Sequence, residues 1–309
     1  MTDDRSTETR PPPPHDGPHV IRLPDGRHLA YAEYGLAGGQ PVVYCHGFPS
    51  SRREARLLHA PAVAIGARII APDRPGYGDS DDAPGRSLAD WADDCAALVE
   101  QLQLTRFAIL GVSGGGPYAL ACARHLPGHL QARLHACTLV CPLGAIYRDE
   151  LLDQMNPAAR ASLLLGRQPV WLANLVYGAP TTAILSRWPN LVEQVRHIAA
   201  PPADRAVLRE GDTADILNQT IADAMQHGAP GARRDLSLYT HDWRLDLRRI
   251  TRPIRIWHGT ADGTVPIGHA RWLAEQLPNA RLTELPGEGH YSVPIRYARP
   301  ILGELLGAA

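Results

Sequence analysis

The chain has 309 residues and a formal net charge of -1, and all 31 of its basic residues are arginine. This length is at the upper end for one hydrophobic core, so we expect one α/β domain that carries an inserted subdomain. The near-neutral charge argues against a nucleic-acid partner. No run of about 18 apolar residues occurs, which argues against a membrane span.

The five cysteines are odd in number and scattered, and the 14 histidines show no metal-ligand spacing. A disulfide framework is therefore not expected, and neither a metal nor another cofactor is predicted. Residues 1–18 are polar and rich in proline, which predicts a flexible tail. Because this tail lacks the apolar core of a signal peptide, we expect a cytoplasmic location.

Strand and helix patterns alternate through most of the chain, beginning with an antiparallel hairpin, His19–Leu23 and Arg27–Tyr34, around Pro24-Asp25-Gly26. Short apolar runs predict six further strands, at Pro41–Cys45, Ala67–Ala71, Phe107–Leu110, Leu134–Val140, Ile254–His258 and Ala280–Leu285. Helical spacing predicts helices at Arg53–Ile65, Leu88–Leu104, Pro117–Leu126, Ile267–Leu277 and Val293–Leu306.

Residues 142–237 interrupt this alternation. They show no clear strand pattern, and prolines break their helix-like pieces. We therefore predict a helical cap at 142–237, inserted into a core made of residues 19–141 and 238–309. The core is predicted as an α/β fold with a mostly parallel, eight-stranded sheet flanked by helices. Function is expected beyond the carboxyl ends of the strands.

The segment Phe107–Pro117 contains the pattern G-x-S-x-G at Gly111 to Gly115, between a predicted strand and a predicted helix. Strand, sharp turn and helix are the setting that this pattern requires for an exposed nucleophilic serine. The glycines remove side chains that would clash in so tight a turn. The pattern therefore indicates that Ser113 is a nucleophile.

A nucleophilic serine needs a base, and the base needs an acid that orients it. Asp262 follows the predicted strand that ends at His258, and His290 follows the strand that ends at Leu285. The order Ser113, Asp262, His290, with each residue just past a strand end, predicts a catalytic triad. Asp149, well past the strand Leu134–Val140, is the competing candidate for the acid.

On these residues the chain resembles the α/β-hydrolase superfamily, from about His19 to Leu306. The markers of the resemblance are HGFP at 46–49, DRPGYGDS at 73–80, GVSGGG at 111–116, HGTADGTVP at 258–266 and GEGH at 287–290. The resemblance implies that residues 142–237 are the family's cap. It also implies an oxyanion hole built from the backbone N–H groups of Phe48 and Gly114.

The identity of residue 113 narrows the implied chemistry. Relatives that open epoxides or cleave carbon–halogen bonds carry an aspartate nucleophile, so Ser113 favours acyl transfer to water. We expect hydrolysis of a small-molecule carboxylic ester with a small to medium apolar group. Phe48, with Trp171 and Trp188 of the cap, is expected to contact that group.

Several alternatives remain open at this stage. The same triad could hydrolyse a lactone, an amide or peptide, or a carbon–carbon bond, or it could form a peracid. A member of the fold that binds a ligand without catalysis is the alternative from another class. No oligomeric state is predicted.

Overall fold

The computed structural model describes residues 15–168 and 200–307, and its eight strands form one sheet in the order β1-β2-β4-β3-β5-β6-β7-β8. β1 and β2 form the predicted antiparallel hairpin, β2 also pairs antiparallel with β4, and the remaining pairs are parallel. The mostly parallel, eight-stranded α/β sheet is thereby confirmed. The strands are β1 (His15–Arg22), β2 (His28–Gly35), β3 (Gln40–Cys45), β4 (Ala67–Pro72), β5 (Phe107–Val112), β6 (Leu134–Val140), β7 (Ile254–Gly259) and β8 (Ala280–Leu285).

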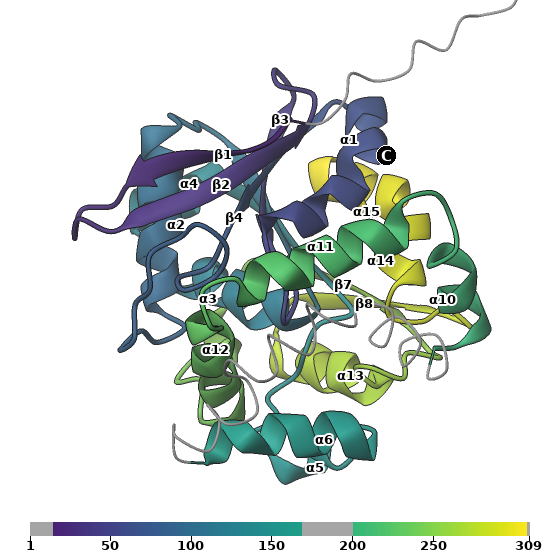
Figure 1. Ribbon diagram of the computed structural model, residues 1–309. Helices are drawn as coiled ribbons and strands as arrows, with labels where there is room; N and C mark the ends of the chain where they lie inside the picture. The colour runs from purple at the N-terminus through teal and green to yellow at the C-terminus, as the bar shows by residue number, and fades with distance from the viewer. Residues whose placement is uncertain (1–14, 169–199, 308–309) are drawn as a thin grey trace, which may run out of the picture.

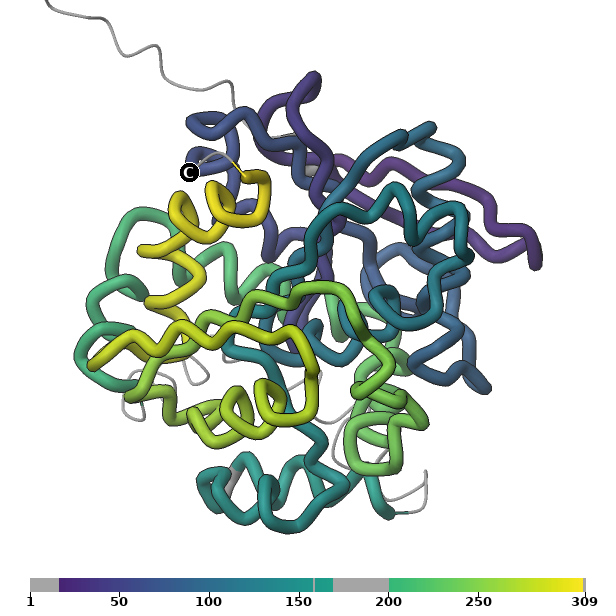
Figure 2. Tube along the Cα trace, turned by 180° about the vertical axis from the view of Figure 1, so that it is seen from behind, coloured from purple at the N-terminus to yellow at the C-terminus, as the bar shows by residue number. Residues whose placement is uncertain are grey.

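Helices cover both faces of the sheet (Figures 1 and 2). α1 (His59–Ile65) and α15 (Ala298–Leu306) lie side by side on one face. α2 (Asp90–Gln101), α3 (Gly116–His125) and α13 (Ile267–Gln276) pack on the other. A sheet covered on both faces buries its strands completely, which is why β5 is buried at every position and lacks the alternation of a half-exposed strand.

Two predicted helices are interrupted. The segment predicted as one helix from Arg53 forms the 3-10 helix η1 (Arg52–Leu58) followed by α1. The predicted C-terminal helix forms α14 (Ser292–Arg296) and α15, with a break at Tyr297. Pro300 lacks the N–H that would bond to the carbonyl of Arg296, so one continuous helix is not stable there.

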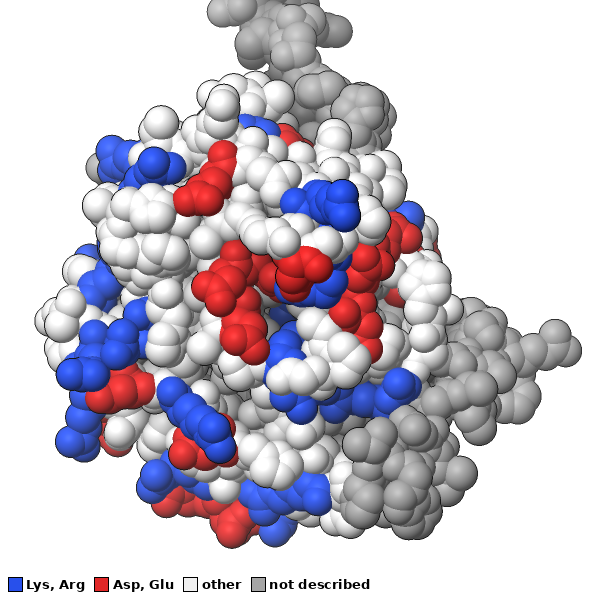
Figure 3. Space-filling model, turned by 90° about the vertical axis from the view of Figure 1, so that its left-hand side faces the viewer, with Lys and Arg blue, Asp and Glu red and all other residues white. Residues whose placement is uncertain are grey.

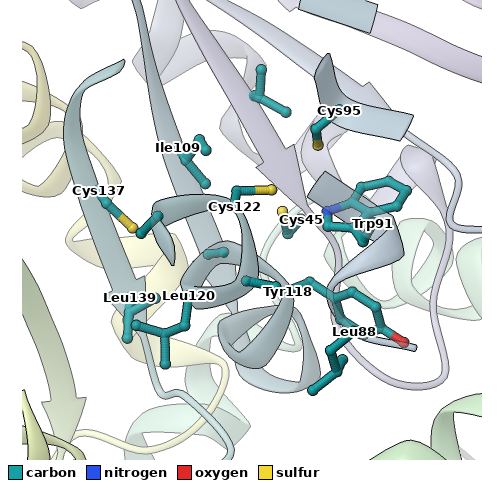
Figure 4. Packing of buried hydrophobic residues seen from close by; sticks show 14 of the residues in the cluster. Cys45, Leu88, Trp91, Cys95, Ile109, Tyr118, Leu120, Cys122, Cys137 and Leu139 are labelled. Atoms are coloured by element: carbon teal, nitrogen blue, oxygen red, sulfur yellow. The ribbon is translucent and has the colours of Figure 1, made fainter. Parts of the chain in front are cut away.

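Cys45, Cys95, Cys122 and Cys137 lie in the core on the face of the sheet that α2 and α3 cover, whereas Cys141 lies in the core on the other face. Figure 4 shows the thiols of Cys45, Cys95 and Cys122 close together beside Trp91. All five cysteines are buried and free. Burial raises the pKa of the Cys45 and Cys122 thiols well above the usual value. These side chains therefore behave as small apolar groups and are poor nucleophiles.

The described part of the predicted cap, 142–168 and 200–237, is helical. Its helices are α5 (Asp149–Leu152), α6 (Pro157–Leu164), η3 (Leu165–Arg167), α10 (Pro202–Val207), α11 (Thr213–Met225) and the first part of α12 (Pro230–Thr240). The boundary drawn at 237 falls inside α12, and the tail boundary drawn at 18 falls inside β1. Shorter helices elsewhere are η2 (Ser113–Gly115), α4 (Gly128–Arg133) and η4 (Leu247–Arg249).

Charges of both signs cover the face in Figure 3, where acidic side chains gather near the middle. Beside the β1–β2 hairpin, a hollow is lined by Asp25, Asp82, Asp90, Asp93 and Asp94 together with Arg27 and Arg86. An acidic surface of this kind disfavours a polyanion on this face. Within residues 15–168 and 200–307, none of the helices has the length and apolar character that crossing a bilayer requires.

The strand register brings the expected functional loops together. Cys45 at the end of β3 pairs with Gly111 near the end of β5, and Gly259 at the end of β7 pairs with Leu285 at the end of β8. The chain runs from β3 to β4 on one side, whereas β5 lies on the other side of β3. The loops after β3 and β5 thus diverge at a topological switch point, where open α/β sheets form their ligand sites.

Candidate active site

Ser113 follows β5 directly and has a backbone φ of 54°. This is the left-handed region, which costs free energy for a residue with a side chain. The turn is crowded: a Cβ at Gly111 would lie 2.7 Å from the Cβ of Ala119, and one at Gly115 would lie 2.0 Å from the carbonyl oxygen of Cys45. Only glycine fits at these two positions, so the local sequence allows the strained turn that presents Ser113.

The side chains of Ser113, His290 and Asp262 form a continuous chain of contacts. His290 Nδ1 lies 2.7 Å from Asp262 Oδ2, and His290 Nε2 lies 3.0 Å from Ser113 Oγ. Because a carboxylate only accepts hydrogen bonds, Nδ1 carries the proton and donates it to Asp262. In the neutral imidazole, Nε2 then accepts a hydrogen bond from the Ser113 hydroxyl. The structure thus brings all three predicted residues together.

Asp262 is buried and surrounded by donors. Its Oδ1 accepts the backbone N–H groups of Thr264 and Val265, each at 2.8 Å. Burial alone would raise the pKa of Asp262, but the positive charge and hydrogen bond of His290, with a contact from His258, hold it well below its usual range. The carboxylate therefore stays ionised beside His290.

His258 is a second buried histidine at this carboxylate. Its Nε2 lies 2.8 Å from the carbonyl oxygen of Val265 and 3.4 Å from Asp262 Oδ2. A carbonyl only accepts, so Nε2 carries the proton and faces the carboxylate as well. This contact adds a second imidazole N–H near Asp262 Oδ2, the oxygen that His290 also contacts.

The backbone of His290 is held by a carboxylate from the inserted segment. Asp204 of α10 is buried and accepts the N–H groups of His290 at 2.8 Å, Tyr291 at 3.0 Å and Ser292 at 2.8 Å. A Cβ at Gly289 would lie 2.4 Å from Asp204 Oδ2, so glycine is required for this approach. Asp204 therefore fixes the loop that carries the histidine.

Three carboxylates surround the His290 ring. Burial alone would lower the pKa of His290, but Asp262, Asp204 and Glu54 favour the imidazolium, and the pKa is raised above 6.5 as a result. The imidazolium that forms when the ring accepts a proton is therefore stabilised from several sides.

A buried charged cluster holds the loops after β3 and β5. Arg74 donates to the carbonyl oxygens of His46 and of Gly47, the latter at 2.8 Å. Tyr239 of α12 donates to the carbonyl oxygen of Gly114 at 2.8 Å. A Cβ at Gly114 would lie 2.7 Å from the Cβ of Phe48, so the two predicted oxyanion-hole residues are neighbours.

Asp235 of α12 is the centre of this cluster. It is fully buried and accepts hydrogen bonds from Arg74, Arg86, Tyr77 and Tyr118. The hydroxyl of Tyr239, which donates to Gly114, also lies 3.2 Å from this carboxylate. Burial alone would raise the pKa of Asp235, but the two guanidinium groups and Tyr118 hold it well below its usual range. The cluster links α12 to both loops beside Ser113.

A pocket of about 130 Å³ opens on Ser113 and His290. Its wall is mostly apolar, with a few polar groups, which is the usual composition of a small-molecule site. Phe48 lies in this wall, whereas Trp171 and Trp188, the other residues expected to contact substrate, lie outside the described residues. The apolar side chains of the wall are Phe48, Pro49, Leu57, Leu58, Val112, Leu217, Ile221, Pro294 and Ile295.

Asp149, the competing candidate for the acid, lies elsewhere. It begins α5, its side chain is 76% exposed, and it pairs with Arg167 at 3.0 Å. It therefore does not contact His290, and the acid beside the histidine is Asp262.

Within the described residues, Cys141, His258 and Asp262 form a group whose possible metal-ligand atoms lie within 4.8 Å of one another. Asp262 already accepts from His290 and from two backbone N–H groups, and His258 Nε2 donates to Val265. Burial raises the pKa of the Cys141 thiol well above its usual value, which disfavours the thiolate that binds a metal. The surrounding donors therefore stabilise Asp262 as a hydrogen-bonded carboxylate, and the three residues do not favour a bound metal ion.

The sequence did not reveal the roles of Glu54, Asp204, Asp235 or His258. Arg74 lies in the DRPGYGDS marker and His258 in the HGTADGTVP marker, so these two had a local signal. Asp204 and Asp235 have none, because their partners are 86 or more and 117 or more residues away, apart from Tyr239.

Comparison with known proteins identifies the family of the chain. The sequence model of the alpha/beta hydrolase fold family matches residues 40–296, and the chain belongs to that family.

Similar proteins within the family carry different activities in their names. The chain is 30% identical over 280 residues to a non-heme haloperoxidase of Rhodococcus erythropolis, covering 87% of this chain and 92% of that protein. It is 28% identical over 261 residues to a pimeloyl-[acyl-carrier protein] methyl ester esterase of Aromatoleum aromaticum, covering 81% and 90%. The structure of a bromoperoxidase from Bacillus anthracis matches with a TM-score of 0.69 and 21% identity, covering 94% and 99%.

Proposed function

We propose that this protein is a serine hydrolase that cleaves a small to medium apolar carboxylic ester through an acyl-enzyme on Ser113. The observation that carries the proposal is the hydrogen-bond chain from Ser113 through His290 to Asp262, at the edge of a small apolar pocket. The likeness to a pimeloyl-[acyl-carrier protein] methyl ester esterase supports the same reaction class.

In the first half of the proposed reaction, His290 Nε2 takes the proton of Ser113 as Oγ attacks the ester carbonyl carbon. The carbonyl oxygen becomes an oxyanion, which the N–H groups of Phe48 and Gly114 stabilise. Each such donor lowers the barrier by about 3 kcal/mol. The carbon–oxygen bond to the alcohol then breaks, the alcohol leaves with the proton from His290, and the acyl group stays on Ser113.

In the second half, His290 takes a proton from water, and the hydroxide attacks the acyl carbon. The second oxyanion collapses, the bond to Ser113 Oγ breaks, and Oγ regains the proton from His290. Asp262 remains ionised throughout and stabilises the imidazolium twice in each cycle. The products are a carboxylic acid and an alcohol.

Perhydrolysis is the second candidate, because a relative 30% identical to this chain is named a haloperoxidase. Hydrogen peroxide would then replace water in the second half and leave as a peracid. The first half and the residues that carry it are the same. Peracid release from an ester in added hydrogen peroxide, measured against acid release in water, separates the two.

The direct test is hydrolysis of a panel of esters, lactones, amides and diketones by the native protein and by Ser113→Ala. We expect ester turnover that falls by about 10⁶-fold in the variant, because the other groups cannot act without the nucleophile. Ester turnover that survives in purified Ser113→Ala contradicts the proposal. Turnover of another substrate class alone assigns a different bond to the same serine.

The size of the pocket sets a further expectation. Each methylene of an acyl chain that enters the apolar wall adds about 0.8 kcal/mol until the pocket is full. Rates across p-nitrophenyl esters should therefore rise over short chains and fall at long ones. A rate that continues to rise to long chains would require an open groove.

A further inference from the structure

Glu54 is the one acidic side chain in the described wall of the pocket that opens on Ser113. It comes from η1, and the mechanism above gives it no role. Its neighbours in the wall include Leu57, Leu58 and Val112, so a carboxylate here is costly to desolvate unless something uses it.

The two oxygens of Glu54 differ in what they bind. Oε2 accepts the N–H of Gly47 at 2.6 Å and the hydroxyl of Tyr44 at 3.1 Å. Among the described residues, Oε1 accepts no hydrogen bond. Burial raises the pKa of Glu54, while the contacts with Gly47 and Tyr44 and the charges of Arg74 and His290 oppose that rise. Within the described residues, the hydrogen bonds that hold the side chain are thus made through Oε2, and Oε1 can accept a hydrogen bond from another group.

Oε1 borders the space in which substrate must stand. An ideal Cβ built on Gly47 would lie 3.0 Å from Glu54 Oε1 and 3.6 Å from Ser113 Cβ. Both side chains therefore approach the same face of Gly47, and both line the pocket. Because residue 47 is glycine, it places no side chain between Glu54 Oε1 and the side chain of Ser113.

We propose that Glu54 is a specificity residue, whose Oε1 accepts a hydrogen bond from an ammonium or hydroxyl group that the substrate carries close to its scissile carbonyl. The inference rests on the proposed ester hydrolysis at Ser113 and replaces a wholly apolar substrate with an amino or hydroxy ester. In a mostly apolar wall, the one carboxylate favours a substrate that brings a donor, because Oε1 loses water without replacement when a substrate lacks a donor.

Glu54 does not enter the bond changes. It lies beside Ser113 and contributes to the charge around His290, but the proton of Ser113 passes to His290 Nε2. Its expected effect is therefore on the choice among substrates, and a purely structural carboxylate would leave that choice unchanged.

The test compares three methyl esters of equal size: 3-aminopropanoate, 3-hydroxypropanoate and butanoate. Acid release is measured near neutral pH, where the amine is an ammonium. We expect kcat/KM to be about tenfold higher for the ammonium ester than for butanoate, with the hydroxy ester between them. The order of the first two tells whether charge or hydrogen bonding dominates.

Glu54→Gln is the informative variant, because the amide oxygen can still accept the N–H of Gly47 while the charge is lost. It should abolish the preference for the ammonium ester, so that the ratio of its kcat/KM to that of butanoate falls to about one. Glu275→Gln, which changes an exposed glutamate on α13, is the matched control and should keep the native ratio. Equal ratios in the native protein and in Glu54→Gln overturn the proposal.

A second readout separates this inference from the ester assignment. Ser113 is labelled with two fluorophosphonates of equal length, one ending in an ammonium and one in a methyl group. Labelling needs an activated serine but no ester turnover. Faster labelling by the ammonium reagent, lost in Glu54→Gln, supports the role of Glu54 even if every ester fails. Equal labelling rates contradict it even if esters are cleaved.

Discussion

The two halves of the site are held in different ways, although a carboxylate from the segment after residue 200 holds each. On the histidine side, the donors that Asp204 meets within the described residues are backbone N–H groups. On the serine side, Asp235 meets two guanidinium groups and three tyrosines. Asp204 thus binds a short stretch of neutral backbone donors, whereas Asp235 belongs to a buried charged cluster that joins three segments of the chain.

The difference follows from what each loop must do. The loop of His290 leads into α14, and the first N–H groups of a helix have no partner within the helix. The carboxylate of Asp204 accepts several of them. The loops after β3 and β5 expose carbonyl oxygens toward the core, so they need donors, and Arg74 and Tyr239 supply these. Because the guanidinium groups are buried, Asp235 is needed to balance their charge.

The largest effect on rate is expected from Asp262→Asn, which leaves the contacts of Asp204 and of Asp235 intact. The amide favours the wrong tautomer of His290 and cannot stabilise its imidazolium, so kcat should fall by about 10⁴-fold. The melting temperature should change little beside this loss. Steady-state rates with p-nitrophenyl butanoate and a thermal melt measure both.

Asp149→Asn is the matched control for that variant, since Asp149 is exposed and distant from His290. It should keep the native rate. A loss of activity in Asp149→Asn together with normal activity in Asp262→Asn would reverse the assignment of the acid.

Asp235→Asn should have the largest effect on stability. It leaves Arg74 and Arg86 buried without their counter-charge, which costs about 3–5 kcal/mol of unfolding free energy. Denaturant unfolding followed by tryptophan fluorescence measures the loss. If Asp235→Asn unfolds at the native midpoint, the cluster does not hold the serine side as described.

Asp204→Asn should cost less stability, about 2 kcal/mol, because it weakens hydrogen bonds to a carboxylate but leaves no buried guanidinium group without its counter-charge. Its amide N–H₂ would face the N–H of His290, so the histidine loop should shift, and kcat should fall about tenfold. Stability and kcat measured on Asp204→Asn and Asp235→Asn in parallel sharpen the comparison. Equal losses of stability in both variants would contradict the distinction between the backbone contacts of Asp204 and the charged cluster of Asp235.

The smallest expected effect concerns pH. Carboxylates around His290 favour its charged form, which is inactive as a base, so kcat/KM should rise with pH through a pKa above 6.5. Asp204→Asn and Glu54→Gln each remove a negative charge, so the imidazolium is less favoured and the rise should move to lower pH. A rise that moves to higher pH would contradict this electrostatic account.

Local patterns were enough to predict the sheet and the three residues at its strand ends. β5 and β3 are short apolar runs, and Ser113, Asp262 and His290 each follow a strand by a few residues. Parallel strands align their carboxyl ends, so position along the chain translates into position in space.

The residues that hold these loops in place could not be predicted in the same way. Asp204 lies in a proline-broken stretch with no motif, and it meets His290 only after the inserted segment folds back. Glu54 reads as an ordinary helical acid, yet η1 directs it to Gly47 and the pocket. The apolar spacing of the C-terminal segment predicted one continuous helix and gave no sign of the break at Tyr297 that accompanies Pro300.

The central claim is that an acyl group passes through Ser113, and a quenched-reaction mass measurement tests it most directly. The protein is mixed with p-nitrophenyl butanoate, quenched in acid during turnover and digested with trypsin. Cleavage after Arg106 and Arg124 releases residues 107–124, in which Ser113 is the one serine. We predict a butanoyl group on this peptide, located at Ser113 by fragmentation and absent from Ser113→Ala. Turnover with no acyl group on this peptide, or with one at another residue, would contradict the account.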